Sequence, residues 1–136
     1  MKFEPVRYRD LNARQKENYN FQKIAARMAD FGFNCLRLTD DWQGADFIAC
    51  HHDGDTFLKV QLKGRMAIDK KYLGKTIHIA FLSGADCFVY DHDALVHFIE
   101  ERRPAGTGRA SWRDHGTYHW PTLPSWAIEF LSDYKM

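Results

Sequence analysis

Two stretches of alternating polar and apolar residues, 45–51 and 56–63, flank an Asp53-Gly54 pair. An Asp-Gly pair is among the strongest signals for a two-residue hairpin loop, because a type I′ turn needs a positive φ at both central positions. With this pair at the turn, the two stretches become neighbouring antiparallel strands in one register. The sequence therefore predicts a β-hairpin and assigns each of its side chains to one of two faces.

The predicted register sorts the hairpin side chains by their chemistry. Asp46 lies opposite Gln61, and Lys63 projects to the same side two residues further along. Directly opposed side chains have Cβ atoms about 4.5–5.5 Å apart, so these three groups are expected to converge on one patch. This polar face carries Asp46, Lys59, Gln61 and Lys63, whereas the opposite face carries Phe47, Ala49, Leu58, Val60 and Leu62.

The rest of the chain combines helical and strand patterns. A helix is expected over 13–31, with Asn12 and Gln15 forming a capping box at its start. On this helix Glu17 lies four residues before Phe21, so it is expected on the core-facing stripe. Further expected elements are a strand over 33–38, a polar turn over 39–44, strands over 76–83 and 85–91, a helix over 93–103 that Pro104 stops, and a short final helix from about Ser125.

The sequence GAD at 44–46, followed by QLK at 61–63, resembles the motif of the PD-(D/E)xK phosphodiesterases. This superfamily has the restriction-endonuclease-like fold and includes Holliday-junction resolvases and some homing endonucleases. The resemblance covers roughly residues 12–100. It implies an α/β fold with an αβββαβ core, in which helices flank a central mixed sheet. The whole chain is expected to form one domain, with a nuclease-like core over 12–103 and an aromatic-rich C-terminal extension over 104–136.

The same resemblance implies a role for each polar residue of the motif. Asp46 would bind a divalent metal, Lys63 would orient or activate the attacking water, and the helical Glu17 would help to hold the metal or its water. Gln61 stands where the family has a second acid, and would offer an amide ligand beside the Leu62 carbonyl. Mg²⁺ accepts such a set of hard oxygen ligands and keeps several waters, and Mn²⁺ is an alternative.

Charge is segregated along the chain although the net charge is only +1. Residues 30–55 hold six acids against one arginine, and residues 59–75 hold six basic residues against one acid. An acidic segment that could hold a cation, followed by a basic one that could hold phosphate, suits phosphodiester chemistry, although a solvated surface of mixed charge is the simpler interpretation. The predicted phosphate-binding residues are Lys59, Arg65, Lys70, Lys71 and Lys75.

Several other features narrow the expected class of protein. No stretch approaches the roughly 20 apolar residues of a membrane-spanning helix, and no secretory signal is visible, so a cytoplasmic location without membrane association is expected. The spacing of the histidines and of the three cysteines is not typical of a zinc site or a disulfide framework. Asp40 and Asp41 would become extra ligands only if their turn folds back toward the site. The aromatic residues of the tail could stack on bases, form a dimer surface or pack in the core.

Together these observations predict a Mg²⁺-dependent DNA endonuclease, with RNA as an alternative substrate. Since one domain carries one site, cutting both strands of a duplex would be easiest for a symmetric homodimer. The competing hypothesis is a non-catalytic member of the same fold, which binds nucleic acid or protein because Gln61 has degraded its metal site.

Overall fold

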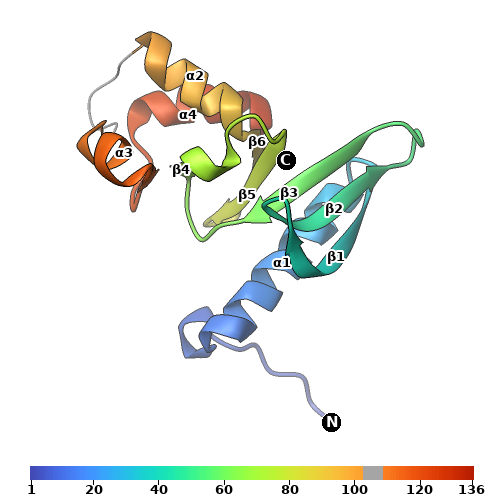
Figure 1. Cartoon of the computed structure of the whole chain (residues 1–136). Coiled ribbons are helices and arrows are strands. Elements are labelled where there is room, and N and C mark those ends of the chain that lie inside the picture. The colour runs from blue at the N-terminus through green and yellow to red at the C-terminus, as the bar shows by residue number, and fades with distance from the viewer. Residues whose placement is uncertain (103–108) are drawn as a thin grey trace.

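The computed structural model of the chain describes residues 1–102 and 109–136 and has a mixed α/β architecture (Figure 1). Its α-helices are α1 (Ala13–Ala29), α2 (His92–Arg102), α3 (Arg109–His115) and α4 (Ser125–Leu131). Its strands are β1 (Phe33–Trp42), β2 (Ala45–His51), β3 (Phe57–Leu62), β4 (Ala67–Asp69), β5 (Ile77–Ser83), β6 (Asp86–Asp91) and β7 (Thr117–His119). Single 3₁₀ turns are η1 (Tyr8–Asp10), η2 (Lys70–Tyr72) and η3 (Ser132–Tyr134).

The strands of the described residues form a five-stranded sheet in the order β1-β2-β3-β5-β6 and a two-stranded sheet of β4 and β7. In the larger sheet β3 and β5 run parallel, whereas the other neighbouring strands run antiparallel. Helix α1 packs on one face of this sheet, and α2 and α4 lie together near β5 and β6 (Figure 1). The expected mixed sheet flanked by helices is therefore present.

Helix α1 begins where the capping signal predicts. The Asn12 side chain accepts a hydrogen bond from the Gln15 amide, and the Gln15 side chain accepts one from the Asn12 amide, both at 2.9 Å. The helix ends at Ala29, two residues before the predicted end. Gly32 follows with a φ of +85°, a left-handed conformation that suits glycine.

The hairpin register is confirmed, but the predicted turn type is wrong. Cys50 pairs with Phe57, and three further pairs extend this register along β2 and β3. Gly54 has a positive φ and Asp53 does not, so the loop is not a type I′ turn. Instead, the Asp53 carboxylate accepts hydrogen bonds from the amides of Asp55 and Thr56, each at 2.8 Å. The register survives because the apolar side chains of both strands must face α1.

Strand β1 is longer than its sequence pattern predicts. It continues through the expected polar turn to Trp42, and only Gln43 and Gly44, both with positive φ, connect it to β2. The pairing between β1 and β2 is irregular between Arg37 and Trp42, because the register shifts there. Asp40 and Asp41 therefore belong to the end of a strand.

The connection from β3 to β5 corrects the expected αβββαβ order. Residues 63–76 are all described, and they form β4 and η2 where the αβββαβ core implied by the resemblance has an α-helix. Tyr90 of β6 fixes this connection, since its buried hydroxyl donates to the Ala67 carbonyl at 2.6 Å and accepts from the Ala67 amide at 2.9 Å. A short strand held by β7 and by Tyr90 thus replaces the helix.

The core has two parts, one on each face of the larger sheet. Ile24 and Met28 of α1 pack against the apolar face of the hairpin. On the other face, side chains of β5, β6 and α2 pack with those of the C-terminal extension, including Trp120 and Phe130. The aromatic tail therefore serves mainly in core packing.

The predicted helix stop, Pro104, lies outside the described residues. No helix within the described residues is long and apolar enough to cross a membrane.

Candidate functional site

The alternation of side chains along β2 breaks at Asp46. Ala45 and Phe47 are two residues apart and both fully buried, yet they belong to the core parts on opposite faces of the sheet. The pairing of β2 with β3 ends at Phe47, one pair before the predicted Asp46–Gln61 pair. Beyond it, the Leu62 amide donates to Oδ2 of Asp46 at 2.8 Å, so the carboxylate takes the place of a backbone acceptor.

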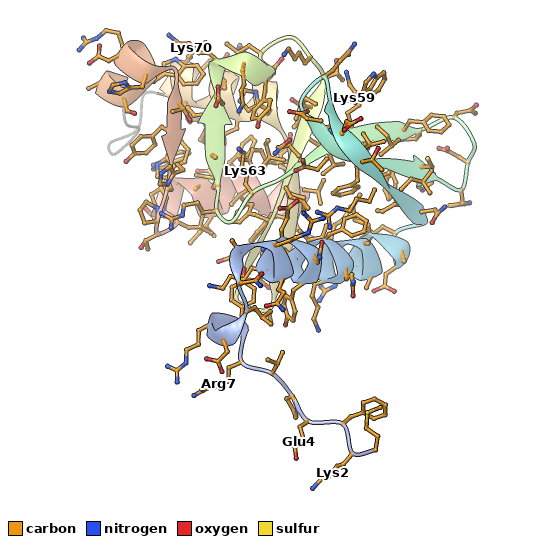
Figure 2. All side chains as sticks on the ribbon, turned by 60° about the horizontal axis from the view of Figure 1, so that its bottom comes forward. Lys2, Glu4, Arg7, Lys59, Lys63 and Lys70 are labelled. Carbon is orange, nitrogen blue, oxygen red and sulfur yellow. The ribbon has the colours of Figure 1, made fainter. Side chains whose placement is uncertain are left out.

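Tyr72 of η2 packs against this irregular end of the hairpin. A Cβ on Gly44 would lie 3.0 Å from Cδ1 of Tyr72, so the backbone before Asp46 rests almost directly on the ring. The ammonium groups of Lys63 and Lys71 lie 5.4 and 5.1 Å from the centre of the same ring. Figure 2 shows Lys63 near the middle of the molecule. The connection between β3 and β5 therefore gathers positive charge close to the hairpin end.

An open cavity of about 570 Å³ lies on the α1 side of this end. Its lining comes from α1, from β1 and from Asp46, and consists of Arg14, Glu17, Asn18, Arg37, Leu38, Thr39, Asp40, Asp41 and Asp46. Glu17 does not point into the core as predicted. Its side chain is about half exposed, at 53%. Glu17 and Asp46 nevertheless share the cavity.

Arg37 links β1 to the first turns of α1 inside the cavity. One guanidinium nitrogen forms an ion pair with Glu17, and another donates to the Asn18 side chain at 2.7 Å. The guanidinium also lies over the Phe21 ring, 5.2 Å from its centre. Arg37 can reach these partners because it pairs with Phe47, which places it on the α1 face of the sheet.

The two motif residues that titrate have perturbed pKa values. Burial raises the pKa of Asp46, and the carboxylates of Glu17 and Asp41 raise it further, while the Leu62 amide and Lys63 lower it. Burial lowers the pKa of Lys63, as does the neighbouring Lys71, against the attraction of nearby carboxylates. Both groups are thus less stable in their charged forms than in water, which is common where ionisable groups are held for chemistry.

The Gln61 side chain forms a hydrogen bond with the backbone of Leu62. The Gln61 amide nitrogen donates to the Leu62 carbonyl oxygen at 3.4 Å, a long hydrogen bond. The carbonyl predicted as a metal ligand is therefore partly covered by the side chain predicted to bind the metal beside it. The Leu62 amide also donates to the Asp46 carboxylate, so Gln61 and Leu62 lie at the same end of the hairpin as Asp46.

The predicted phosphate-binding residues divide among four segments. Lys59 is in β3, Arg65 follows it, Lys70 and Lys71 are in η2, and Lys75 precedes β5. Lys71 adjoins the site through Tyr72. Lys70 and Arg65 contact the C-terminal part of the chain instead. Lys70 lies over the Trp112 ring, and the Arg65 guanidinium lies 3.3 Å from Nδ1 of His119. Figure 2 shows Lys59 and Lys70 toward the upper rim of the molecule in that view.

Four charged residues of the cavity were not given a firm role by the sequence, namely Arg14, Arg37, Asp40 and Asp41. Asp41 lines the cavity with Asp46, and its carboxylate accepts a hydrogen bond from the Gly44 amide at 2.9 Å. The sequence predicts a polar turn over 39–44 and so places Asp41 in a loop, whereas in the structure Asp41 belongs to β1. Arg37 could have been found from its opposition to Phe47, which assigns it to the face that α1 covers.

Comparisons of this chain with known protein families, with curated proteins and with solved structures give no match. The function of the site is therefore inferred from its own residues and their geometry.

Proposed function

We propose that this protein is a Mg²⁺-dependent endonuclease that hydrolyses phosphodiester bonds of DNA at the cavity of Asp46 and Glu17. The observation that carries the proposal is the combination of carboxylates in one open cavity with an adjacent ammonium group. The carboxylates of Glu17 and Asp41 repel the negative charge of Asp46, and the Lys63 ammonium attracts it. A divalent cation would relieve the repulsion among the carboxylates, and a nearby ammonium would attract a phosphate.

The donor set fits Mg²⁺ if the ion keeps most of its water. Within the described part of the chain, no three His, Cys, Asp or Glu side chains come close enough to hold a metal between them. Mg²⁺ commonly binds proteins through one or two carboxylates and completes its shell with water and substrate phosphate. Asp46 would supply one oxygen ligand to the ion. Glu17 would supply a second oxygen once its ion pair with Arg37 is broken. When bound, the ion would offset the charge that develops on the phosphate oxygens.

Lys63 would act on the reacting phosphate and on the water that attacks it. Its half-buried ammonium, whose pKa burial lowers, is held near Asp46 and over Tyr72. A positive group that is already in place stabilises the charge of the transition state at little reorganisation cost. Lys71, over the same ring, would extend this positive surface toward the DNA backbone, as Lys59, Arg65, Lys70 and Lys75 would at greater distance.

The restriction-endonuclease-like fold is part of this proposal. The supporting features are a helix before a three-stranded antiparallel unit, and a parallel partner for the third strand of that unit. Asp46 lies in the second of these strands and Gln61 in the third, and Lys63 directly follows the third strand, at the end where the Leu62 amide donates to Asp46. The missing helix between β3 and β5 is a departure from the expected core.

The test is DNA cleavage by the purified chain in Mg²⁺, in Mn²⁺ and in EDTA, with supercoiled, linear, single-stranded and branched substrates and a single-stranded RNA. Asp46→Asn and Lys63→Met should each reduce cleavage by about 100-fold or more, since each removes a charge that acts on the transition state. The matched controls are Asp55→Asn in the exposed hairpin loop and Lys23→Met on the outside of α1, which should cleave like the wild type.

The non-catalytic alternative is favoured by one specific observation, the engagement of Glu17 by Arg37 combined with Gln61 in place of an acid. A protein of this kind would bind DNA equally well in Mg²⁺ and in EDTA and would cleave no substrate. That result would overturn the proposed activity. Cleavage that needs the metal, and that Asp46→Asn and Lys63→Met abolish, would instead exclude the alternative.

A further inference from the structure

Two hollows lie beside the segment that follows β3. The first, of about 290 Å³, opens between α1 and the end of β5, and we term it the tyrosine hollow. Its lining consists of Tyr8, Tyr19, Asn20, Gly64, Leu82 and Gly84. The second, of about 350 Å³, is lined by Arg65 together with residues 120–123, and we term it the arginine hollow. Gly64 and Leu82 line both hollows, so the hollows meet at these two residues.

The junction of the two hollows adjoins the proposed catalytic site. Gly64 directly follows Lys63, which is labelled in Figure 2 and whose amide donates to the Ala80 carbonyl at 3.0 Å. One residue before Lys63, the Leu62 amide donates to the Asp46 carboxylate. A strand of nucleic acid that lies across Lys63 therefore extends over Gly64 into the hollows.

Helix α1 borders both the cavity of Asp46 and the tyrosine hollow. Asn18 lines the cavity, and the next residue, Tyr19, lines the hollow. The hollow thus opens beside the first turns of the same helix that brings Glu17 to Asp46. A ligand that occupies both places needs no part of the protein to move.

The fold does not require a glycine at position 64. Gly64 has no positive φ, and a Cβ built on it would meet no atom within 4 Å. Open space therefore lies in front of the backbone where the two hollows meet, and another chain can approach the backbone closely there. A larger side chain at this position would fill the junction without disturbing the packing around it.

The tyrosine hollow combines exposed aromatic rings with positive charge. Tyr8 is 43% exposed, and its ring packs edge-on against Tyr19 with centres 5.3 Å apart. The Asn20 side chain donates to the Tyr8 hydroxyl at 3.1 Å, which fixes Tyr8 to α1. The ammonium groups of Lys16 and Lys23 lie 5.5 and 5.4 Å from the centres of the Tyr8 and Tyr19 rings. Aromatic side chains beside cations are the usual means of holding unpaired bases and their phosphates.

The charges around the two hollows favour a polyanion. Arg65 is the one charged residue among the residues that line them. Within the part of the chain that the structure describes, no carboxylate forms an ion pair with Arg65, Lys16 or Lys23. The acids nearest in sequence to Tyr8, Tyr19 and Gly84 are each in an ion pair of their own, namely Asp10 with Arg7, Glu17 with Arg37 and Asp86 with Lys135. The positive charge at the hollows is therefore available to phosphate groups.

We propose that the tyrosine hollow and the arginine hollow bind an unpaired strand of DNA, which makes single-stranded DNA, or the single-stranded part of a branched DNA, the ligand of this end of the protein. The inference rests on the proposed nuclease function, because it names the substrate class of that site. An unpaired base enters the tyrosine hollow, and the backbone passes over Gly64 between Lys63 and Arg65. The paired and stacked bases of a duplex cannot enter a hollow in this way unless they are first turned out of the helix.

The test is binding of a fluorescent oligothymidine of roughly 16 nucleotides, compared with a duplex of the same length, by fluorescence anisotropy in EDTA. EDTA keeps cleavage out of the measurement. The single strand should bind about 10-fold or more tightly than the duplex. Tyr8→Ala should weaken binding of the single strand by about 5-fold or more, since base–aromatic stacking is lost.

Gly64→Leu tests the junction of the hollows by filling it. This variant should weaken binding of the single strand by about 10-fold or more, and Gly64→Ala, which adds one methyl group, should weaken it less. Both variants should keep the melting temperature of the wild type, because the added atoms meet open space. Phe31→Ala, at an exposed phenylalanine outside both hollows, is the matched control for Tyr8→Ala and should bind like the wild type.

The outcomes separate this inference from the proposed function. Equal affinity for single strand and duplex would overturn the inference, and so would binding that Tyr8→Ala and Gly64→Leu leave unchanged. Tighter binding of a single-stranded RNA of the same length would overturn the choice of DNA. Cleavage of duplex and single-stranded DNA alike in Mg²⁺, unchanged in Gly64→Leu, would leave the proposed function standing and reject the hollows. Single-strand binding that depends on Gly64 and Tyr8, without cleavage of any substrate, would confirm the hollows and reject the hydrolysis.

Discussion

Replacing Gly44 by alanine tests how closely the hairpin end rests on η2. Gly44 has a φ of +89°, a conformation that costs an L-residue about 1–2 kcal/mol. The new Cβ would also lie 3.0 and 3.1 Å from two carbons of the Tyr72 ring. That ring is 3% exposed and packs edge-on against the buried His92, so it cannot move aside freely. Overpacking of this kind costs about a further 1–3 kcal/mol.

The matched control is Gly54→Ala in the hairpin loop. Gly54 has a φ of +78°, and a Cβ there would meet no atom within 4 Å, so only the backbone cost of about 1–2 kcal/mol applies. Gly44→Ala should therefore reduce the free energy of unfolding by about 2–5 kcal/mol, which exceeds the control by about 1–3 kcal/mol. Urea denaturation followed by circular dichroism measures both.

The same comparison bears on the site, since Gly44 precedes Asp46 by two residues. We expect Gly44→Ala to weaken Mg²⁺-dependent cleavage by displacing Asp46, while Gly54→Ala leaves cleavage unchanged. Equal losses of stability in the two variants would refute the reasoning, because they would show that the contact with Tyr72 contributes nothing.

Three further changes test other parts of the fold. Tyr90→Phe should cost about 2–4 kcal/mol in urea denaturation, because it leaves both backbone groups of Ala67 without their buried partner; a loss below about 1 kcal/mol would contradict this. Asp46→Asn should raise the melting temperature near neutral pH. Burial raises the pKa of Asp46, so the unfolded chain ionises first as pH rises and wild-type stability falls through that window. This gain should vanish in melts below about pH 3, where the carboxyl is protonated in both states. Asn12→Ala should cost about 1 kcal/mol, measured by thermal unfolding, and Gln15→Ala should cost part of it if the capping box acts as a pair.

Much of the local structure could be predicted from the sequence. The bounds of β5 and β6, the start of α1 at Asn12 and the register of Cys50 with Phe57 follow from capping chemistry and from the alternation of apolar side chains. These signals act between residues that are close along the chain or directly opposed across one hairpin. The turn at Asp53 was predicted wrongly because its carboxylate caps the loop amides, which the strand pattern does not reveal.

The position of the motif residues depended on tertiary structure. The sequence by itself determined that Asp46, Gln61 and Lys63 lie at one end of a hairpin. Only the packing of Ala45 and Phe47 against different faces of the sheet turned Asp46 to the Leu62 amide. The same is true of the ion pair of Arg37 with Glu17, and of Tyr72 beneath Lys63. Such contacts join segments that are distant in sequence, and their geometry is set by how the helices and the second sheet pack, which no local pattern encodes.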